Sequence, residues 1–65
     1  MLGTVKFFNH DRGFGFIGRE QGEDVFVHVS NLAPGASATI ADGQAVEFEI
    51  APGRRGDEAR NVRPV

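Results

Sequence analysis

Hydrophobic and polar positions alternate with a period of two along several short stretches of the chain, the spacing of strands with one face in water. In residues 24–29 three valines share one face, and polar or aromatic residues share the other. Residues 45–50 alternate in the same way and place Phe48 inward. No stretch of about ten residues has the apolar spacing of an amphipathic helix. The pattern therefore predicts short strands and no long helix.

Turn-forming residues divide the chain at short intervals. Residues 9–13, 20–23 and 52–57 combine Gly with Asn, Asp, Glu or Pro, a composition typical of turns and loops. Residues 30–43 are expected to form a long loop with at most one short helical turn, capped by Ser30. The strands predicted between these breaks are 2–9, 14–19, 24–29, 45–50 and 59–65.

Five strands in a chain of 65 residues indicate a closed or nearly closed barrel, because closure removes strand edges that a small sheet cannot protect. No repeat or linker interrupts the sequence, so residues 1–65 are expected to form one domain. Inward positions of the strands define the predicted core, which consists of Ile17, Val25, Val27, Val29, Val46, Phe48, Ile50 and Val62.

Charge and composition narrow the choice of partners. Seven basic residues against nine acidic ones give a net charge of -2, whereas proteins that hold duplex DNA through its phosphates carry a basic surplus. Cysteine is absent, so no disulfide is possible and a reducing compartment is the simplest expectation. No apolar run is long enough for a signal segment or a membrane span. We expect a soluble, cytoplasmic protein without a membrane partner.

Phenylalanines and basic residues gather in the first half of the chain. In residues 12–17, strand parity places Arg12, Phe14 and Phe16 on one face, and Phe26 takes the matching face of the next strand. Burying this face would also bury charged residues, which is costly unless they are paired. Exposed rings beside basic groups suit single-stranded nucleic acid, because each unpaired base gains about 1–3 kcal/mol by stacking on a ring.

Four segments resemble the bacterial cold-shock proteins, in order and nearly end to end: GTVKFFN (3–9), RGFGFI (12–17), DVFVH (24–28) and DGQAVEF (42–48). The second and third segments are similar to the RNP1 and RNP2 motifs of that family. The resemblance implies an all-β, five-stranded antiparallel OB-fold barrel that binds single-stranded RNA and DNA with a modest pyrimidine preference. It further implies a monomeric RNA chaperone and regulator of transcription or translation in the stress response, which is not an enzyme and needs no cofactor.

The resemblance also implies which residues bind. Phe7 replaces the usual Trp, Val29 stands where an aromatic residue is common, and the loop around Ser37 lacks an aromatic residue, so we expect weaker binding or a shorter footprint. Strand parity cannot expose both Phe7 and Phe8, but a β-bulge near Lys6 would let both rings reach solvent. The expected nucleic-acid-binding residues are Lys6, Phe7, Phe8, Asn9, Arg12, Phe14, Phe16, Asp24, Phe26, His28 and Arg55.

Other functions fit the sequence less well. RRM domains share the RNP1 pattern but need two helices. Asp24, His28 and Ser30 share a strand face, yet Asp24 and His28 would lie about 13 Å apart, too far for a catalytic pair. The two histidines form no recognisable metal site. A barrel that binds a protein or peptide through the same aromatic face is the main alternative. In the 52–57 loop, Arg55 is the expected phosphate contact and Arg54 is interpreted as solvated.

Overall fold

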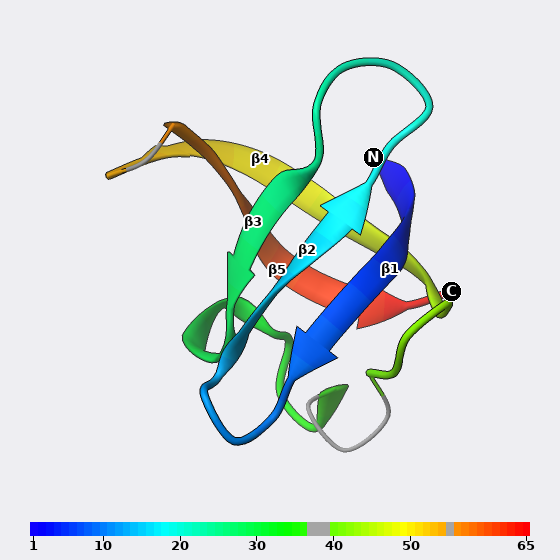
Figure 1. Ribbon diagram of the computed structural model, residues 1–65, viewed down its shortest axis with the longest axis vertical. Coiled ribbons are helices and arrows are strands. Elements are labelled where there is room, and N and C mark those ends of the chain that lie inside the picture. The colour runs from blue at the N-terminus through cyan, green and yellow to red at the C-terminus, as the bar shows by residue number, and fades with distance from the viewer. Residues whose placement is uncertain (37–39, 55) are drawn as a thin grey trace.

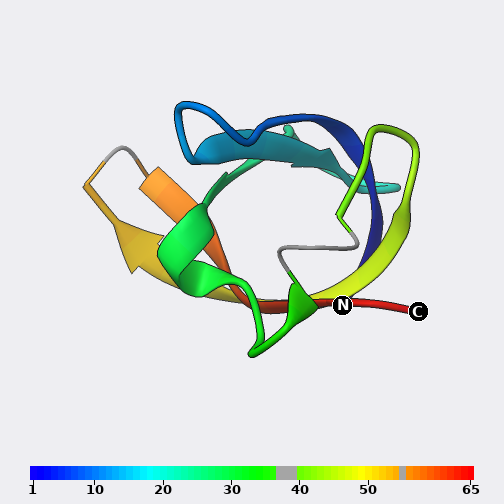
Figure 2. The same cartoon turned by 90° about the horizontal axis from the view of Figure 1, so that it is seen from below.

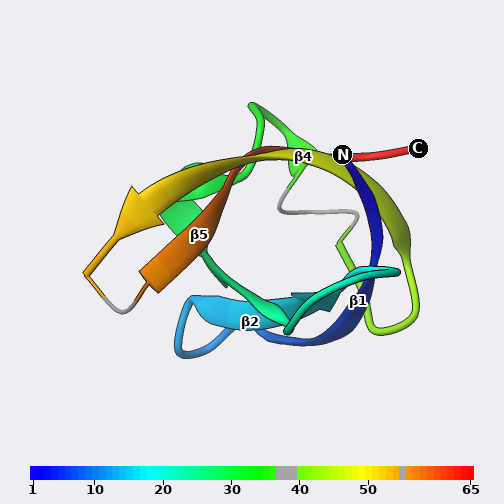
Figure 3. The same ribbon diagram turned by 90° about the horizontal axis from the view of Figure 1, so that it is seen from above.

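Five strands close into a barrel in the computed structural model, which describes residues 1–36, 40–54 and 56–65. The strands surround one interior when viewed along the barrel from either end (Figures 2 and 3). Around the barrel the order is β1, β2, β3, β5, β4. The elements, shown in Figure 1, are β1 (Leu2–Asn9), β2 (Phe14–Gly18), β3 (Val25–His28), η1 (Val29–Asn31), β4 (Ala45–Gly53) and β5 (Gly56–Pro64).

The predicted all-β barrel is confirmed, with one difference in strand direction. Strand β1 pairs antiparallel with β2 and β4, and the pairs β2–β3 and β4–β5 are antiparallel as well. Strands β3 and β5 are parallel and pair through Phe26 and Glu58. Directions cannot alternate all the way around a closed ring with an odd number of strands, so at least one neighbouring pair must be parallel. An entirely antiparallel barrel was therefore a wrong expectation.

The predicted bulge in β1 is present, but its effect on Phe8 differs from the expectation. The pairing register with β2 shifts between Val5 and Phe7, which leaves Lys6 as the extra residue. A bulge changes the parity of everything that follows it. Lys6 and Phe7 therefore both face outward, and Phe8 turns inward, where it is only 7% exposed. The expectation that Phe8 presents its ring to solvent is wrong.

The barrel interior contains most of the predicted core. Phe48 is fully buried, as its alternation predicted, whereas Ile50 is only partly buried. Five buried residues were absent from the predicted core, in β1, in β5 and between β3 and β4: Val5, Phe8, Ala36, Ile40 and Ala59. Among the described residues the buried core is Val5, Phe8, Ile17, Val25, Val27, Ala36, Ile40, Val46, Phe48, Ala59 and Val62.

The chain leaves the barrel wall after β3 and forms the short 3-10 helix η1. His28 caps this turn, since its Nδ1 accepts a hydrogen bond from the N–H of Ser30 at 3.2 Å. The expectation that Ser30 is the cap is therefore wrong, although a short helical turn is present at this point of the chain. Val29 is 39% exposed and lies outside the core, contrary to the sequence prediction. The alternation that placed it inward ends at His28, where the strand itself ends.

Candidate nucleic-acid interface

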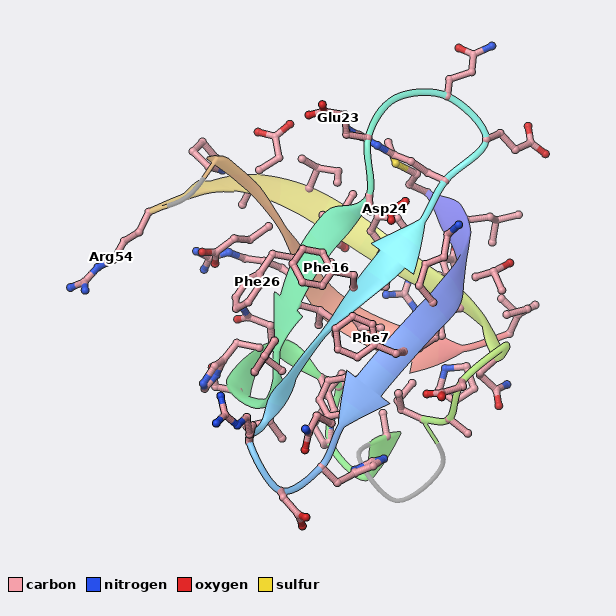
Figure 4. All side chains as sticks on the ribbon, in the orientation of Figure 1. Phe7, Phe16, Glu23, Asp24, Phe26 and Arg54 are labelled. Atoms are coloured by element: carbon pink, nitrogen blue, oxygen red, sulfur yellow. The ribbon has the colours of Figure 1, made fainter. Side chains whose placement is uncertain are left out.

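The outer face of β1, β2 and β3 carries four phenylalanine rings that contact one another in a closed cycle. The ring centroids of Phe7 and Phe16 are 5.6 Å apart, and those of Phe16 and Phe26 are 5.7 Å apart. Phe14 closes the cycle, at 5.9 Å from Phe26 and 6.2 Å from Phe7. Figure 4 shows Phe7, Phe16 and Phe26 in front of these three strands. We call these four rings the aromatic platform.

Strand register explains why the rings meet. Phe16 is paired with both Phe7 on β1 and Phe26 on β3, so the three side chains lie in one row across the sheet. Gly15, between the two β2 rings, points inward, and a Cβ atom there would overlap the backbone of Phe7. The absence of a side chain at that position lets β1 and β2 approach closely. Aromatic pairs at these separations contribute about 0.5–1.5 kcal/mol each beyond their buried area.

The platform rings lie outside the barrel, as the sequence predicted. Phe7 is 41% exposed, and Phe14, Phe16 and Phe26 are partly buried. None of the four belongs to the buried core. The alternative in which Phe14, Phe16 and Phe26 fill the barrel interior is therefore wrong. Each ring is covered in part by its neighbours and keeps part of its surface for a ligand.

Polar residues surround the platform. Asn9 shapes the β1–β2 turn: its Oδ1 accepts from the Arg12 N–H at 3.0 Å, and its carbonyl accepts from the Gly13 N–H at 2.7 Å. Gly13 adopts φ 78°, a left-handed conformation that favours glycine. His28 Nδ1 accepts from Ser30, which leaves Nε2 as the donor of the neutral ring. The exposed residues of this border that the sequence also predicted are Lys6, Asn9, Arg12, Asp24 and His28.

A cleft of about 420 Å³ adjoins the platform on the side of β3 and β5. Two of its lining residues, Arg54 and Glu58, were not among the predicted binding residues. Glu58 lies in the cleft because β5 runs parallel to β3 and pairs Glu58 with Phe26. Arg54 precedes β5 and lines the same cleft. The only sequence signal for Arg54 as a binding residue was its position next to Arg55. Arg55 and Ser37, which the sequence analysis also discussed, lie outside the described residues. The cleft is lined by Arg12, Phe14, Phe26, His28, Arg54 and Glu58.

The charged residues next to the platform are of both signs, so the net charge of -2 does not by itself exclude a polyanion. Acidic residues of β4 lie away from the platform, and one of them, Glu47, forms an ion pair with Arg63 at 3.2 Å. Lys6 and Arg12 lie on the border of the platform with Asp24, and Arg54 and Glu58 line the cleft beside it. Local positive charge of this kind attracts a polyanion even when the whole chain is slightly acidic.

The part of the chain that the structure describes gives no support for a metal site or for a membrane-spanning helix. No group of three or more His, Cys, Asp or Glu side chains there is arranged to hold a metal ion. None of the described helices has the length and apolar character needed to cross a membrane.

The fold and this surface together define a class of protein, the five-stranded OB-fold barrel with an exposed aromatic face. Comparison with known proteins then gives the family. The sequence profile of the 'Cold-shock' DNA-binding domain matches residues 1–65. The chain therefore belongs to the cold-shock domain family and is a nucleic-acid-binding protein.

Several bacterial proteins are similar to the chain over nearly their whole length. A cold shock-like protein CspC of Bacillus cereus is 52% identical over 62 residues, which cover 95% of each chain. The cold shock protein CspC of Bacillus subtilis (strain 168) is 49% identical over 61 residues, 94% of this chain and 92% of the relative. The major cold shock protein of Streptococcus pyogenes serotype M1 is 47% identical over 60 residues, 92% and 90% of the two chains. The predicted family resemblance is confirmed.

Proposed function

We propose that this protein binds single-stranded RNA and DNA by stacking unpaired bases on the aromatic platform. The observation that carries the proposal is the cycle of four mutually contacting rings on the outer face of β1, β2 and β3. A flat ring accepts any base by its π-face, but only when the base is not already stacked and paired in a duplex. The selectivity is therefore for single strands.

The size of the platform is compatible with useful affinity. At about 1–3 kcal/mol per stacked base, four rings supply roughly 4–12 kcal/mol before the cost of association is deducted. A dissociation constant near 1 μM corresponds to about 8 kcal/mol. Stacking thus supplies a large favourable contribution that is offset in part by the cost of association, and ion pairs from Lys6, Arg12 and the arginines of the β4–β5 hairpin add to it.

Binding that depends on ring faces discriminates weakly between sequences, with a modest preference for pyrimidines. Such binding suits an RNA chaperone, since it holds single-stranded segments and opposes their return to secondary structure. The relatives are cold shock proteins, which supports a role after a temperature drop, when RNA secondary structure is more stable. We propose that the protein acts in this way as a cytoplasmic monomer, that it influences transcription or translation through the same binding, and that it has no catalytic role.

The test is an anisotropy titration of fluorescein-labelled hexathymidine, with a labelled, GC-rich duplex that is long enough to stay paired as the control. The proposal predicts saturable binding of the single strand at roughly micromolar protein and much weaker binding of the duplex. No change for the single strand at about tens of micromolar protein would contradict the proposal and favour a protein or peptide as the partner of the platform.

A further inference from the structure

A separate hollow of about 390 Å³ begins at the edge of the platform where Phe7 lies. Phe7 lines both the hollow and the platform, so a strand stacked on the rings can continue into it. Phe8, which is buried by the bulge in β1, also lines this hollow, together with Asn9, His10 and Asp42. The hollow is large enough to take one nucleobase and shares no residue except Phe7 with the platform.

The walls of the hollow are held in position by contacts between two distant parts of the chain. The N–H of Phe8 donates to Oδ1 of Asp42 at 3.1 Å. In the opposite direction, Nε2 of His10 donates to the carbonyl oxygen of Ile40 at 3.0 Å. The imidazole ring of His10 also lies 5.0 Å from the ring of Phe8. The side chains of Asp42 and His10 are therefore held in position before a ligand binds.

The groups offered to a ligand combine acceptors and donors. A carboxylate has about four lone-pair positions, and the N–H of Phe8 uses one of those on Asp42. Oδ1 of Asn9 is occupied by the N–H of Arg12, and among the described residues the NH₂ donors of this amide have no partner. Asp11 adds a second carboxylate to the lining, which disfavours a phosphate group in the hollow.

We propose that this hollow is a guanine subsite at one end of the bound strand, an inference that rests on the proposed single-strand binding. The Watson–Crick edge of guanine carries two adjacent donors, N1–H and N2–H₂, beside the acceptor O6. The donors match the carboxylate of Asp42, and O6 matches the NH₂ group of Asn9. The other bases lack two adjacent donors on this edge, since thymine, uracil, cytosine and adenine each have a single donor group there. The rings of Phe7 and His10 provide faces for the base.

The experiment compares labelled hexathymidine with two hexamers in which guanine replaces the 5′-terminal or the 3′-terminal thymine. We expect one of the guanine hexamers to bind at least about fivefold more tightly than hexathymidine, the lower limit for a bidentate contact to a base. In Asp42→Asn the remaining amide oxygen still accepts from Phe8, but the second acceptor becomes a donor. This variant should lose the guanine preference and retain the affinity for hexathymidine.

The control variant is Glu49→Gln, which removes the same charge from an exposed position on β4, remote from the hollow. It should retain both the affinity and the guanine preference. The inference is wrong if hexathymidine binds and neither guanine hexamer binds more tightly, or if Asp42→Asn keeps the preference; the proposed function then stands. Failure of all three hexamers to bind the unmodified protein would overturn the inference and the proposed function together.

Discussion

The rings of Phe14 and Phe26 are stacked, with 22° between their planes and 5.9 Å between their centroids, although they come from different strands. The register pairs Phe14 with His28 and Phe26 with Phe16, so this contact runs diagonally between β2 and β3. Diagonal neighbours on a sheet are within reach of aromatic side chains. The rings support one another without a ligand, which reduces the ordering cost of binding a strand.

Replacing one ring of the platform should affect binding much more than folding. Phe26→Ala is expected to weaken binding of hexathymidine by about 1–3 kcal/mol, because one stacking surface is lost, and Phe14→Ala and Phe16→Ala should behave similarly. Anisotropy titrations measure this loss, and circular dichroism measures whether the fold persists. Unfolded variants would mean that these rings are required by the fold, and unchanged affinity would mean that they do not contact the strand.

Phe8 should behave in the opposite way, since the bulge turns its ring into the core, where it is 7% exposed. Phe8→Ala is expected to lower the free energy of unfolding by about 3–5 kcal/mol, the usual cost of deleting a buried aromatic ring. Urea unfolding measures this change, and the fully buried Phe48 offers a matched comparison through Phe48→Ala. Near-native stability combined with a loss of binding would show instead that Phe8 is an exposed binding residue, as the sequence analysis expected.

Alternation along the strands was sufficient to predict the barrel and the outward direction of the β2 and β3 rings. Each strand is short, and Val25, Val27 and Phe48 identify the inner face without ambiguity. The exposed face then follows from parity alone, including Phe14 and Phe26.

Features that depend on where regular geometry stops could not be predicted in the same way. A bulge near Lys6 was expected to expose both Phe7 and Phe8, but its exact position turns Phe8 inward. Val29 was misplaced because the end of β3 depends on the cap formed by His28. Arg54 was missed because it reaches the cleft through the return of β5 beside β3, a contact between distant parts of the chain.

The salt dependence of binding tests the limited contribution of charge. Lys6 and Arg12 lie on the platform border, Arg54 lines the cleft, and Arg55 is the phosphate contact expected from the sequence. Four such contacts, at about 0.7 each, predict a slope of about -3 in a plot of log K against log salt. Arg54→Gln should make this slope shallower by about 0.7. The matched control is Arg63→Gln, which removes the same charge from the residue that pairs with Glu47 on β4 and should leave the slope unchanged. A slope steeper than about -5 would contradict binding dominated by stacking.

Asn61 offers a test of the fold that does not involve the interface. It adopts a left-handed conformation with φ 54°, which is tolerated by Asn and Gly but costs other residues about 1–2 kcal/mol. Asn61→Ala should therefore be destabilising by about 1 kcal/mol, and Asn61→Gly should be as stable as the original chain or more stable. Thermal and urea unfolding provide the comparison. Equal stability of the Ala and Gly variants would show that no left-handed residue is needed there.

The central claim, that unpaired bases stack on the outer face of β1, β2 and β3, is tested most directly by a heteronuclear NMR titration with hexathymidine. The account predicts that signals of Phe7, Phe14, Phe16 and Phe26 shift during the titration, while those of outward residues on β4 such as Glu49 stay in place. Binding accompanied by shifts confined to β4 and the C-terminal part of β5, with the four phenylalanines unaffected, would contradict it.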